Sequence, residues 1–343
     1  MATAFEGWGP SGEEAWITMK DDCEVLVRKW AAAPGQRRGV VHICHGISEH
    51  SARYGHLASF LAQEGYTVYC PDQRAHGKTA ERAQTKGELD HSFGHAAGSN
   101  AINKIVEDHE VLCEGELRDP ANANLPFFVF GHSLGSVIAT FVASKPGVST
   151  NVRGLVLSGC PARLPGVMNA AFGPLLTVLR CVYGGNGVAP LIAKLTFEKW
   201  NAKFAPNATD DDWINSDPVE VQKYLDDPLC GFKCSVDFMT GVRDAMTAVG
   251  SMDTLQKLPR NLPVVVMVGA DDACGVTDFG KRSAQQVVEE FARAERRAPK
   301  LVVYGEMRHE LSNELCREEF ASDLVSFLNV CVQHGRRTPH SRL

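Results

Sequence analysis

The stretch that decides the fold is residues 127–136, which read Phe-Phe-Val-Phe-Gly-His-Ser-Leu-Gly-Ser. Its first four apolar residues predict a buried strand, and the apolar run at 137–143 predicts a buried helix. Between them stands G-x-S-x-G, centred on Ser133, in the strand–turn–helix context that this motif requires to present a nucleophilic serine. The turn is crowded, so the residues two before and two after the serine must lack a side chain. The helix N-terminus adds positive potential and backbone N–H groups where an oxyanion would form.

Outward from this stretch, short apolar runs alternate with helical patterns, which predicts an α/β fold with a mostly parallel central sheet and helices on both faces. Strands are predicted at 15–19, 24–30, 39–44, 67–70, 127–130, 155–157, 264–268 and 301–304, and helices at 53–63, 102–112, 137–143, 283–294 and 319–332.

The alternation fails once. More than 100 residues separate Leu157 from the next strand-like run at Val264, far beyond a crossover of about 30 residues. We therefore predict that residues 1–160 and 251–334 form the core, that 161–250 form a helical cap (lid) over the carboxyl edge of the sheet, and that 335–343 form a flexible tail.

Composition excludes several classes of protein. The formal net charge of −6 argues against nucleic-acid binding, because phosphate contacts need a basic face. The chain shows no signal peptide and no run of 18 apolar residues, so we expect neither secretion nor a membrane span. The 11 scattered cysteines suit reduced thiols in a cytoplasmic compartment. The final residues Ser341, Arg342 and Leu343 are similar to the S-K-L address of peroxisome-type organelles.

A serine nucleophile needs a general base, and the base needs a carboxylate to orient it. Asp271, just after the strand at 264–268, is the candidate acid, with the adjacent Asp272 as its rival. His309, in the loop after the strand at 301–304, is the candidate base. Both follow carboxyl ends of strands, where such a sheet places its ligand site. The rival bases His334 and His340 follow no strand.

An oxyanion hole needs two backbone N–H donors. One is predicted from Leu134, which follows the nucleophile, and the other from Ile47, in the loop after the strand at 39–44. His42 and His45 are three apart on a strand and face opposite sides, so they are not expected to bind one metal. We expect His91, His95 and His109 at the surface or packed against helices. No metal or organic cofactor is implied.

The motifs resemble those of the monoacylglycerol lipase and lysophospholipase group of α/β-hydrolases. Residues 45–54 are similar to that group's H-G-x-x-E-H-x-x-R-Y segment, and residues 71–77 to its D-x-R-G-H-G segment, with Ala75 replacing a glycine. The segments around Ser133, Asp271 and His309 match in order. The resemblance implies an α/β-hydrolase fold and hydrolysis of a small lipid ester, a monoacylglycerol or lysophospholipid, through an acyl-enzyme.

The resemblance also implies roles for residues beside the triad. Glu49 and Arg53 match positions near the polar end of the pocket, where they would bind the head group or pair to hold the oxyanion loop; for Arg53 we favour the structural role. Cys274 is interpreted as a small buried hydrophobe. Ser312 departs from the family, whose lipases carry a second histidine there. In the cap, the apolar run at 188–197 would pack on the core, line an acyl tunnel or touch a membrane surface.

Other functions remain open at this point. The rival enzymes are a general carboxylesterase, a thioesterase and a peptidase of the proline-iminopeptidase type. The rival from outside enzymes is a non-catalytic binding protein with the same fold. A dehalogenase or epoxide hydrolase is disfavoured, because those enzymes carry aspartate where Ser133 stands.

Overall fold

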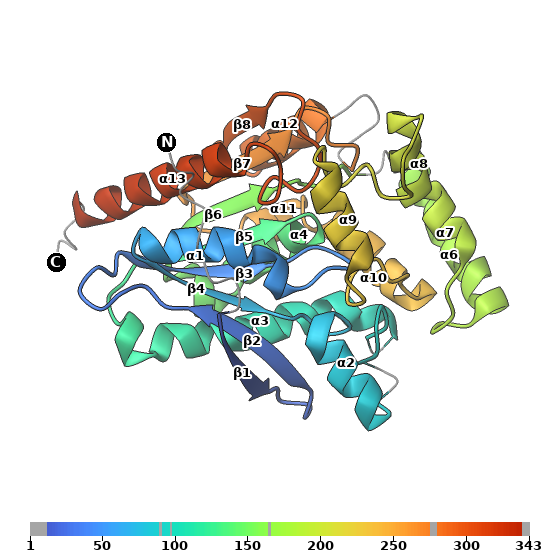
Figure 1. Ribbon diagram of the computed structural model, residues 1–343. Helices are drawn as coiled ribbons and strands as arrows, with labels where there is room; N and C mark the ends of the chain where they lie inside the picture. Colours follow the sequence, from blue (N-terminus) through green and yellow to red (C-terminus); the bar gives the residue numbers. More distant parts are fainter. Residues whose placement is uncertain (1–11, 89–90, 97, 164–165, 275–279, 338–343) are drawn as a thin grey trace.

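The computed structural model describes residues 12–88, 91–96, 98–163, 166–274 and 280–337 (Figure 1). Its centre is one eight-stranded sheet with the order β1-β2-β4-β3-β5-β6-β7-β8. β1 and β2 pair antiparallel, as do β2 and β4, and every other pair is parallel. The strands are β1 Glu13–Thr18, β2 Glu24–Trp30, β3 Gly39–Cys44, β4 Tyr66–Pro71, β5 Phe127–His132, β6 Val152–Ser158, β7 Val264–Gly269 and β8 Lys300–Tyr304.

The central strands are covered on both faces, as their continuous apolar sequences require. Along β3, Val40 and Cys44 face one layer of core while Val41 and Ile43 face the other. Side chains of α3, α4 and α12 fill the first layer, and those of α1 and α13 fill the second. The helices outside the β6–β7 connection are α1 Gly55–Gln63, α2 Gly77–Lys86, α3 Ala101–Arg118, α4 Leu134–Ser144, α5 Pro146–Ser149, α12 Gly280–Arg293 and α13 Arg317–Arg337.

The predicted fold class is confirmed, because the sheet is mostly parallel and helices lie on both of its faces. Each predicted strand and helix corresponds to an observed one, with boundaries that differ by a few residues. Outside the β6–β7 connection, α2 and the four-residue α5 have no counterpart in the prediction. α2 buries Thr79, Ala80 and Ala83 rather than large apolar side chains, so its sequence carries no strong apolar stripe.

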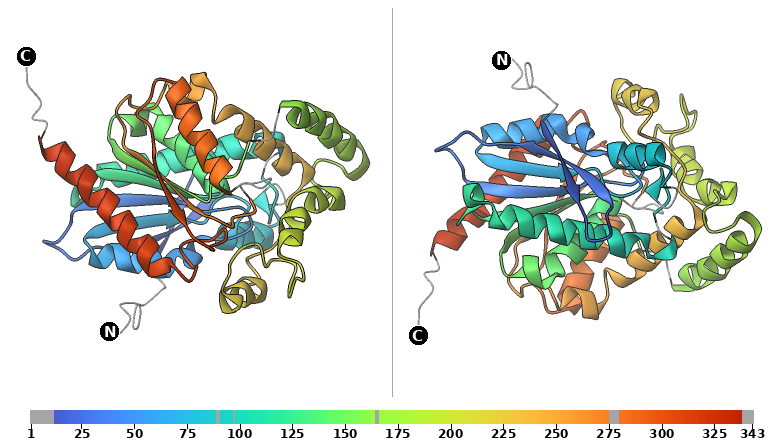
Figure 2. Two further views of the ribbon diagram at one scale, coloured as in Figure 1. Left: turned by 90° about the horizontal axis from the view of Figure 1, so that it is seen from above. Right: turned by 90° about the horizontal axis from the view of Figure 1, so that it is seen from below.

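The connection between β6 and β7 is helical in every regular element that the structure describes there. Two views place α6–α9 together at one end of the molecule, beyond the carboxyl ends of the parallel strands (Figure 2). The next helix, α10, packs back against α3 and α4 of the core. The helices are α6 Gly166–Tyr183, α7 Pro190–Leu195, α8 Phe197–Asn201, α9 Pro218–Asp226, α10 Val236–Ala248 and α11 Met252–Leu255.

The C-terminal helix α13 continues to Arg337, three residues into the segment predicted as a flexible tail. His340 and the terminal tripeptide Ser341, Arg342 and Leu343 lie outside the described residues, so the targeting hypothesis stays a prediction. Within the described residues, every helix is too short or too polar to cross a bilayer. All eleven cysteines lie within the described residues, and none is paired in a disulfide there.

Candidate active site

The turn between β5 and α4 places Ser133 in a strained conformation. Its φ of 52° and ψ of −123° lie in a region that a residue with a side chain rarely occupies. A Cβ at Gly131 would collide with the carbonyl oxygen of Gly135, and one at Gly135 with that of Cys44. Glycine is therefore required at both positions, because the backbone segments approach each other closely. The turn places Ser133 directly after β5, at the carboxyl end of the sheet.

The predicted oxyanion donors lie on either side of this turn. Leu134 is the first residue of α4, so its N–H has no acceptor within the helix. Ile47 belongs to the loop after β3 and lines the same cavity as Ser133 and Leu134. The loop is shaped by Ser48, whose φ of 56° is positive, and by Glu49, whose carboxylate accepts a hydrogen bond from the N–H of Gly46.

Asp272, and not the predicted Asp271, is the carboxylate that contacts His309. Both carboxylate oxygens of Asp272 lie 3.0 Å from Nδ1 of His309, and the Asp272 side chain is completely buried. The N–H of Asp271 continues the backbone pairing by donating to the carbonyl of Met307, which leaves the Asp271 side chain in solvent. The side chain of Asp272, the next residue, points to the opposite side of the chain, into the protein. The prediction of Asp271 was wrong by one position.

His309 is buried among charges that stabilise its protonated form. Burial lowers the pKa of His309, but the charge of Asp272 and the hydrogen bond to it outweigh burial, so the net pKa is raised above the ordinary value. The ring packs against His132, with centroids 4.6 Å apart, and against Trp213, at 5.1 Å. Ser133 and His309 line one narrow cavity together.

The loop that carries His309 is held by the segment after α8. The carbonyl of Ile214 accepts hydrogen bonds from the N–H groups of His309, at 3.1 Å, and Glu310, at 2.9 Å. The Arg308 guanidinium donates to the carbonyl of Asn215 at 3.0 Å. The buried carboxylate of Glu314 accepts from the N–H groups of Arg308 and Ser216, both at 2.8 Å. The position of His309 therefore depends on residues of the β6–β7 connection.

Glu49 and Arg53 belong to a buried cluster with Glu310. Arg53 lies 2.5 Å from the carboxylate of Glu310 and 3.7 Å from that of Glu49. Burial and the charge of Glu310 raise the pKa of Glu49 to about 7, against the opposing effect of Arg53. Glu49 also accepts from the Tyr54 hydroxyl at 2.8 Å and lines the narrow cavity; among the described residues that line the two cavities beside Ser133, Arg53 is absent.

A larger cavity of about 440 Å³ opens beside Ser133, Ile47 and Leu134. Apolar side chains dominate its wall, and they come from α6, α8 and α10 together with the β7–α12 loop. The residues include Phe172, Phe197, Trp200, Met239, Val242, Met246 and Cys274. Cys274 also interacts with the Ser133 hydroxyl, and burial raises the pKa of its thiol well above the ordinary value, which fits its interpretation as a small buried side chain.

The geometry agrees with comparisons to known proteins. A family model described as "Serine aminopeptidase, S33" matches residues 35–316. The chain belongs to this family of serine hydrolases. A monoacylglycerol lipase of Mycolicibacterium smegmatis is 26% identical over 85% of this chain and 88% of its own length. A monoglyceride lipase of Saccharomyces cerevisiae is 25% identical over 80% and 78%.

Among solved structures, a thermostable carboxyl esterase from Bacillus coagulans superposes with a TM-score of 0.79, at 25% identity, over 93% of this chain and 98% of its own. Membership in the S33 hydrolase family confirms the predicted enzyme class and the resemblance on which it was based.

Sequence reasoning missed several residues that support the site in this S33 hydrolase. Trp213 and Ile214 contact His309 across a long separation in sequence, and Glu314 links the His309 loop to Ser216. No local motif marks these residues. The sequence did indicate Asp272 as an alternative acid, because it follows Asp271 just after a predicted strand. Only the direction of each side chain separates the two residues.

Proposed function

We propose that this enzyme hydrolyses monoacylglycerols to a fatty acid and glycerol. The observation that carries the proposal is the position of the 440 Å³ apolar cavity, which opens directly beside Ser133 and both oxyanion candidates. A cavity of this size and lining suits an aliphatic chain whose ester carbonyl lies at the serine. The relatives named as monoacylglycerol lipases, matched over most of their length, support the same substrate class.

Each residue of the site has a role in this mechanism. The Ser133 hydroxyl attacks the ester carbonyl while His309 takes its proton, and Asp272 orients the imidazole and stabilises its charged form. The N–H groups of Ile47 and Leu134 bind the oxyanion. His309 then gives the proton to the departing glycerol oxygen, and water, activated by the same histidine, releases the fatty acid.

A peptidase is the second candidate, because the family description names aminopeptidases. An aminopeptidase needs a free carboxylate to bind the substrate's terminal ammonium. In the large cavity, Glu290 is paired with Arg163 at 3.3 Å. In the narrow cavity, Glu49 and Glu310 share Arg53. These paired carboxylates favour the esterase.

The test is kcat/KM on a panel of monoacylglycerols and lysophospholipids of several chain lengths, a short p-nitrophenyl ester and a proline arylamide. We expect the highest value for a long-chain monoacylglycerol. The Ser133→Ala variant should keep the wild-type melting temperature and lose roughly 10⁶-fold in kcat, the loss known for removal of a triad serine. Preference for the arylamide, or activity on the short ester alone, contradicts the proposal.

Residues 161–250 act as a cap in this proposal, and part of the cap contacts lipid surfaces. Several large apolar side chains on and between α6 and α7 are exposed, including Val178 at 59% and Val182 at 67%. Tyr183, Val188, Leu191 and Leu195, in the same part of the chain, are exposed as well. An exposed apolar group of this kind, on helices that also line the substrate cavity, would bring the enzyme to the surface where its substrate resides.

Cosedimentation with phosphatidylcholine vesicles tests the lipid contact. We expect the double variant Val182→Ser/Leu191→Ser to bind vesicles less than wild type while keeping its activity on a short soluble ester. Val330→Ser is the matched control, because Val330 is similarly exposed but lies on α13, outside residues 161–250. Equal loss in the control, or no binding by wild type, excludes a lipid-binding cap.

A further inference from the structure

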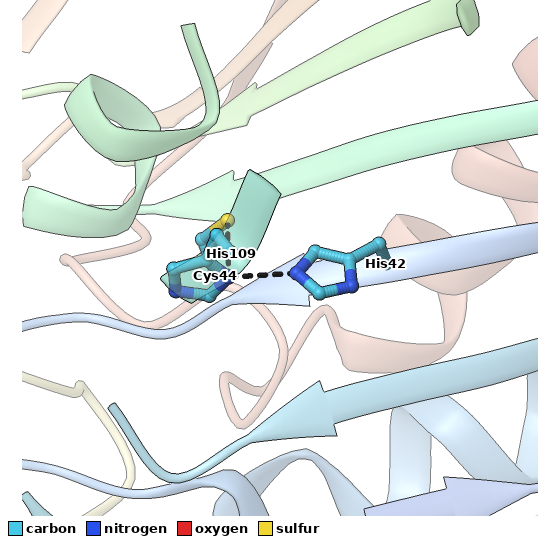
Figure 3. Close-up of side chains that lie close together, drawn as sticks. All are labelled: His42, Cys44 and His109. Atoms are coloured by element: carbon cyan, nitrogen blue, oxygen red, sulfur yellow. Dashed lines mark hydrogen bonds between the residues drawn. The ribbon is translucent and has the colours of Figure 1, made fainter. Parts of the chain in front are cut away.

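The core holds a cluster of metal-binding side chains that the hydrolytic mechanism does not use. His42 and Cys44 are two apart on β3, so both face α3, which contributes His109 (Figure 3). Nε2 of His42 lies 2.7 Å from Nδ1 of His109, and Sγ of Cys44 lies 3.6 Å from that same nitrogen. One ligand atom from each of the three residues lies within 4.8 Å of the others, and all three residues are buried.

We infer that His42, Cys44 and His109 form a binding site for a zinc ion. Two imidazole nitrogens and one thiolate are ligands that zinc prefers, and three protein ligands leave the fourth tetrahedral position for a water molecule. Bonds of about 2.0 Å to nitrogen and 2.3 Å to sulfur place ligand atoms roughly 3.3–3.6 Å apart. The Cys44–His109 distance already meets this, and the His42–His109 pair needs to open by about 0.6 Å.

The surroundings of His42 are those of a metal ligand. Its other nitrogen, Nδ1, lies 2.8 and 3.0 Å from the two carboxylate oxygens of Glu116, one further α3 residue. A metal-binding histidine almost always donates its second N–H to a carboxylate or carbonyl, which fixes the tautomer and the ring orientation. Glu116 therefore holds His42 with Nε2 directed at Cys44 and His109.

Charge balance favours a divalent ion at this place. The carboxyl group of Glu116 is buried against the ring of His42. On binding, the Cys44 thiol loses its proton to solvent, and the proton on Nδ1 of His109 moves to Nε2. The ion's two positive charges then cancel the Cys44 thiolate and the Glu116 carboxylate, so the buried cluster becomes neutral.

The two ring nitrogens of His109 differ in their surroundings. Nδ1 faces His42 and Cys44, whereas Nε2 is buried and has no hydrogen-bond partner within the described part of the chain. Zinc would therefore bind at Nδ1. Of the two alternatives expected for His109, surface or packed, the structure shows it packed: it is buried on α3 and bonded to His42. His45 lies outside the cluster, bonded to the backbone of Gly46 and Gln73.

A second grouping, of His42, Cys113 and Glu116, uses the opposite nitrogen of His42 and supplies a single imidazole. It gives a matched control, because Cys44 and Cys113 are both buried free cysteines beside His42. The Cys44→Ala variant removes a ligand of the inferred site. The Cys113→Ala variant makes the same chemical change and leaves all three ligands in place.

The experiment measures zinc in the untagged full chain, prepared in two ways. One preparation is purified from zinc-supplemented cells, and the other is refolded with zinc; both are then dialysed against chelator. Elemental analysis should find one zinc per chain in wild type and Cys113→Ala, and less than a tenth of that in Cys44→Ala. Glu116→Gln should weaken zinc binding by about 10–100-fold, the usual effect of removing a carboxylate that is hydrogen-bonded to a metal-binding histidine. X-ray absorption of wild type should show one sulfur and two nitrogen neighbours.

Wild-type protein with substoichiometric zinc after both preparations overturns the inference. So does a zinc content that falls in Cys113→Ala and stays in Cys44→Ala, or a shell with more than one sulfur, which would indicate binding by other cysteines. If Cys44→Ala does not fold, two measurements decide the question: the X-ray absorption spectrum of wild-type protein and the zinc affinity of Glu116→Gln.

Discussion

Asp272 presents both of its carboxylate oxygens to Nδ1 of His309, each at 3.0 Å, from a completely buried position. Its neighbour Asp271 is exposed, and the Asp271 carbonyl lies 3.4 Å from Nζ of Lys203. Two adjacent residues of one chemical type therefore occupy opposite environments, and this difference gives a matched pair of variants.

The Asp272→Asn variant should lose about 10⁴-fold in kcat, because an amide favours the wrong tautomer of His309 and cannot stabilise its positive charge. Asp271→Asn should stay within about twofold of wild type, since that side chain contacts solvent. Steady-state kinetics on any good ester substrate separates the two. Equal losses in both variants would show that the carboxylate assignment is mistaken.

The pH profile of kcat/KM follows from the raised pKa of His309. The base must be neutral to accept the Ser133 proton, so activity falls as pH drops through its pKa. Because Asp272 raises the pKa of His309 above its ordinary value, the acidic limb should lie at higher pH in wild type than an unperturbed imidazole would give. In Asp272→Asn the limb should move to lower pH, as burial remains and the stabilising charge is lost. If the acidic limb does not move, Asp272 is not the cause of the raised pKa of His309.

Filling the large cavity should shorten the acyl chain that the enzyme prefers. Met246, on α10, lines this cavity, and Met246→Trp adds volume inside it. We expect kcat/KM for long-chain monoacylglycerols to fall at least tenfold, equivalent to about 1.4 kcal/mol, with little change for a short p-nitrophenyl ester. A uniform loss for all chain lengths would mean that the acyl chain lies elsewhere.

The two roles considered for Arg53 predict different outcomes. Removing its charge in Arg53→Gln leaves Glu49 and Glu310 buried without a counter-ion, which should cost about 3–5 kcal/mol in the free energy of unfolding. Adding Glu49→Gln should recover part of that loss, because one buried carboxylate is then neutral. Chemical denaturation measures both. An unchanged stability combined with a raised KM for monoacylglycerol would instead support head-group binding.

Much of the fold follows from local sequence patterns. The strands around β3, β5, β6 and β7 are continuous apolar runs, and G-x-S-x-G marks the turn at Ser133. Ser133 and His309 were brought together by a general property of parallel sheets, whose strand ends meet at one edge. These features depend on near neighbours in sequence, which is why reasoning from the sequence located them.

Other features depend on distant contacts and were missed for that reason. The direction of Asp272 is fixed by backbone pairing between the residues after β7 and those after β8. Ile214 holds the His309 loop although more than 90 residues separate them, and nothing in its local sequence indicates this. The burial of His109 against His42 likewise required the packing of α3 on β3.

The hydrogen bonds that the Ile214 carbonyl accepts also bear on how such enzymes change substrates during evolution. Ile214 fixes the His309 loop, and the N–H of Gly231 and the hydroxyl of Tyr224 donate to the carbonyl of Ser48, beside the proposed oxyanion donor Ile47. A graft that replaced residues 161–250 by the corresponding segment of a relative would remove these supports together with the pocket wall. Exchange limited to α6–α8 would keep them, so new acyl specificities should arise most readily there.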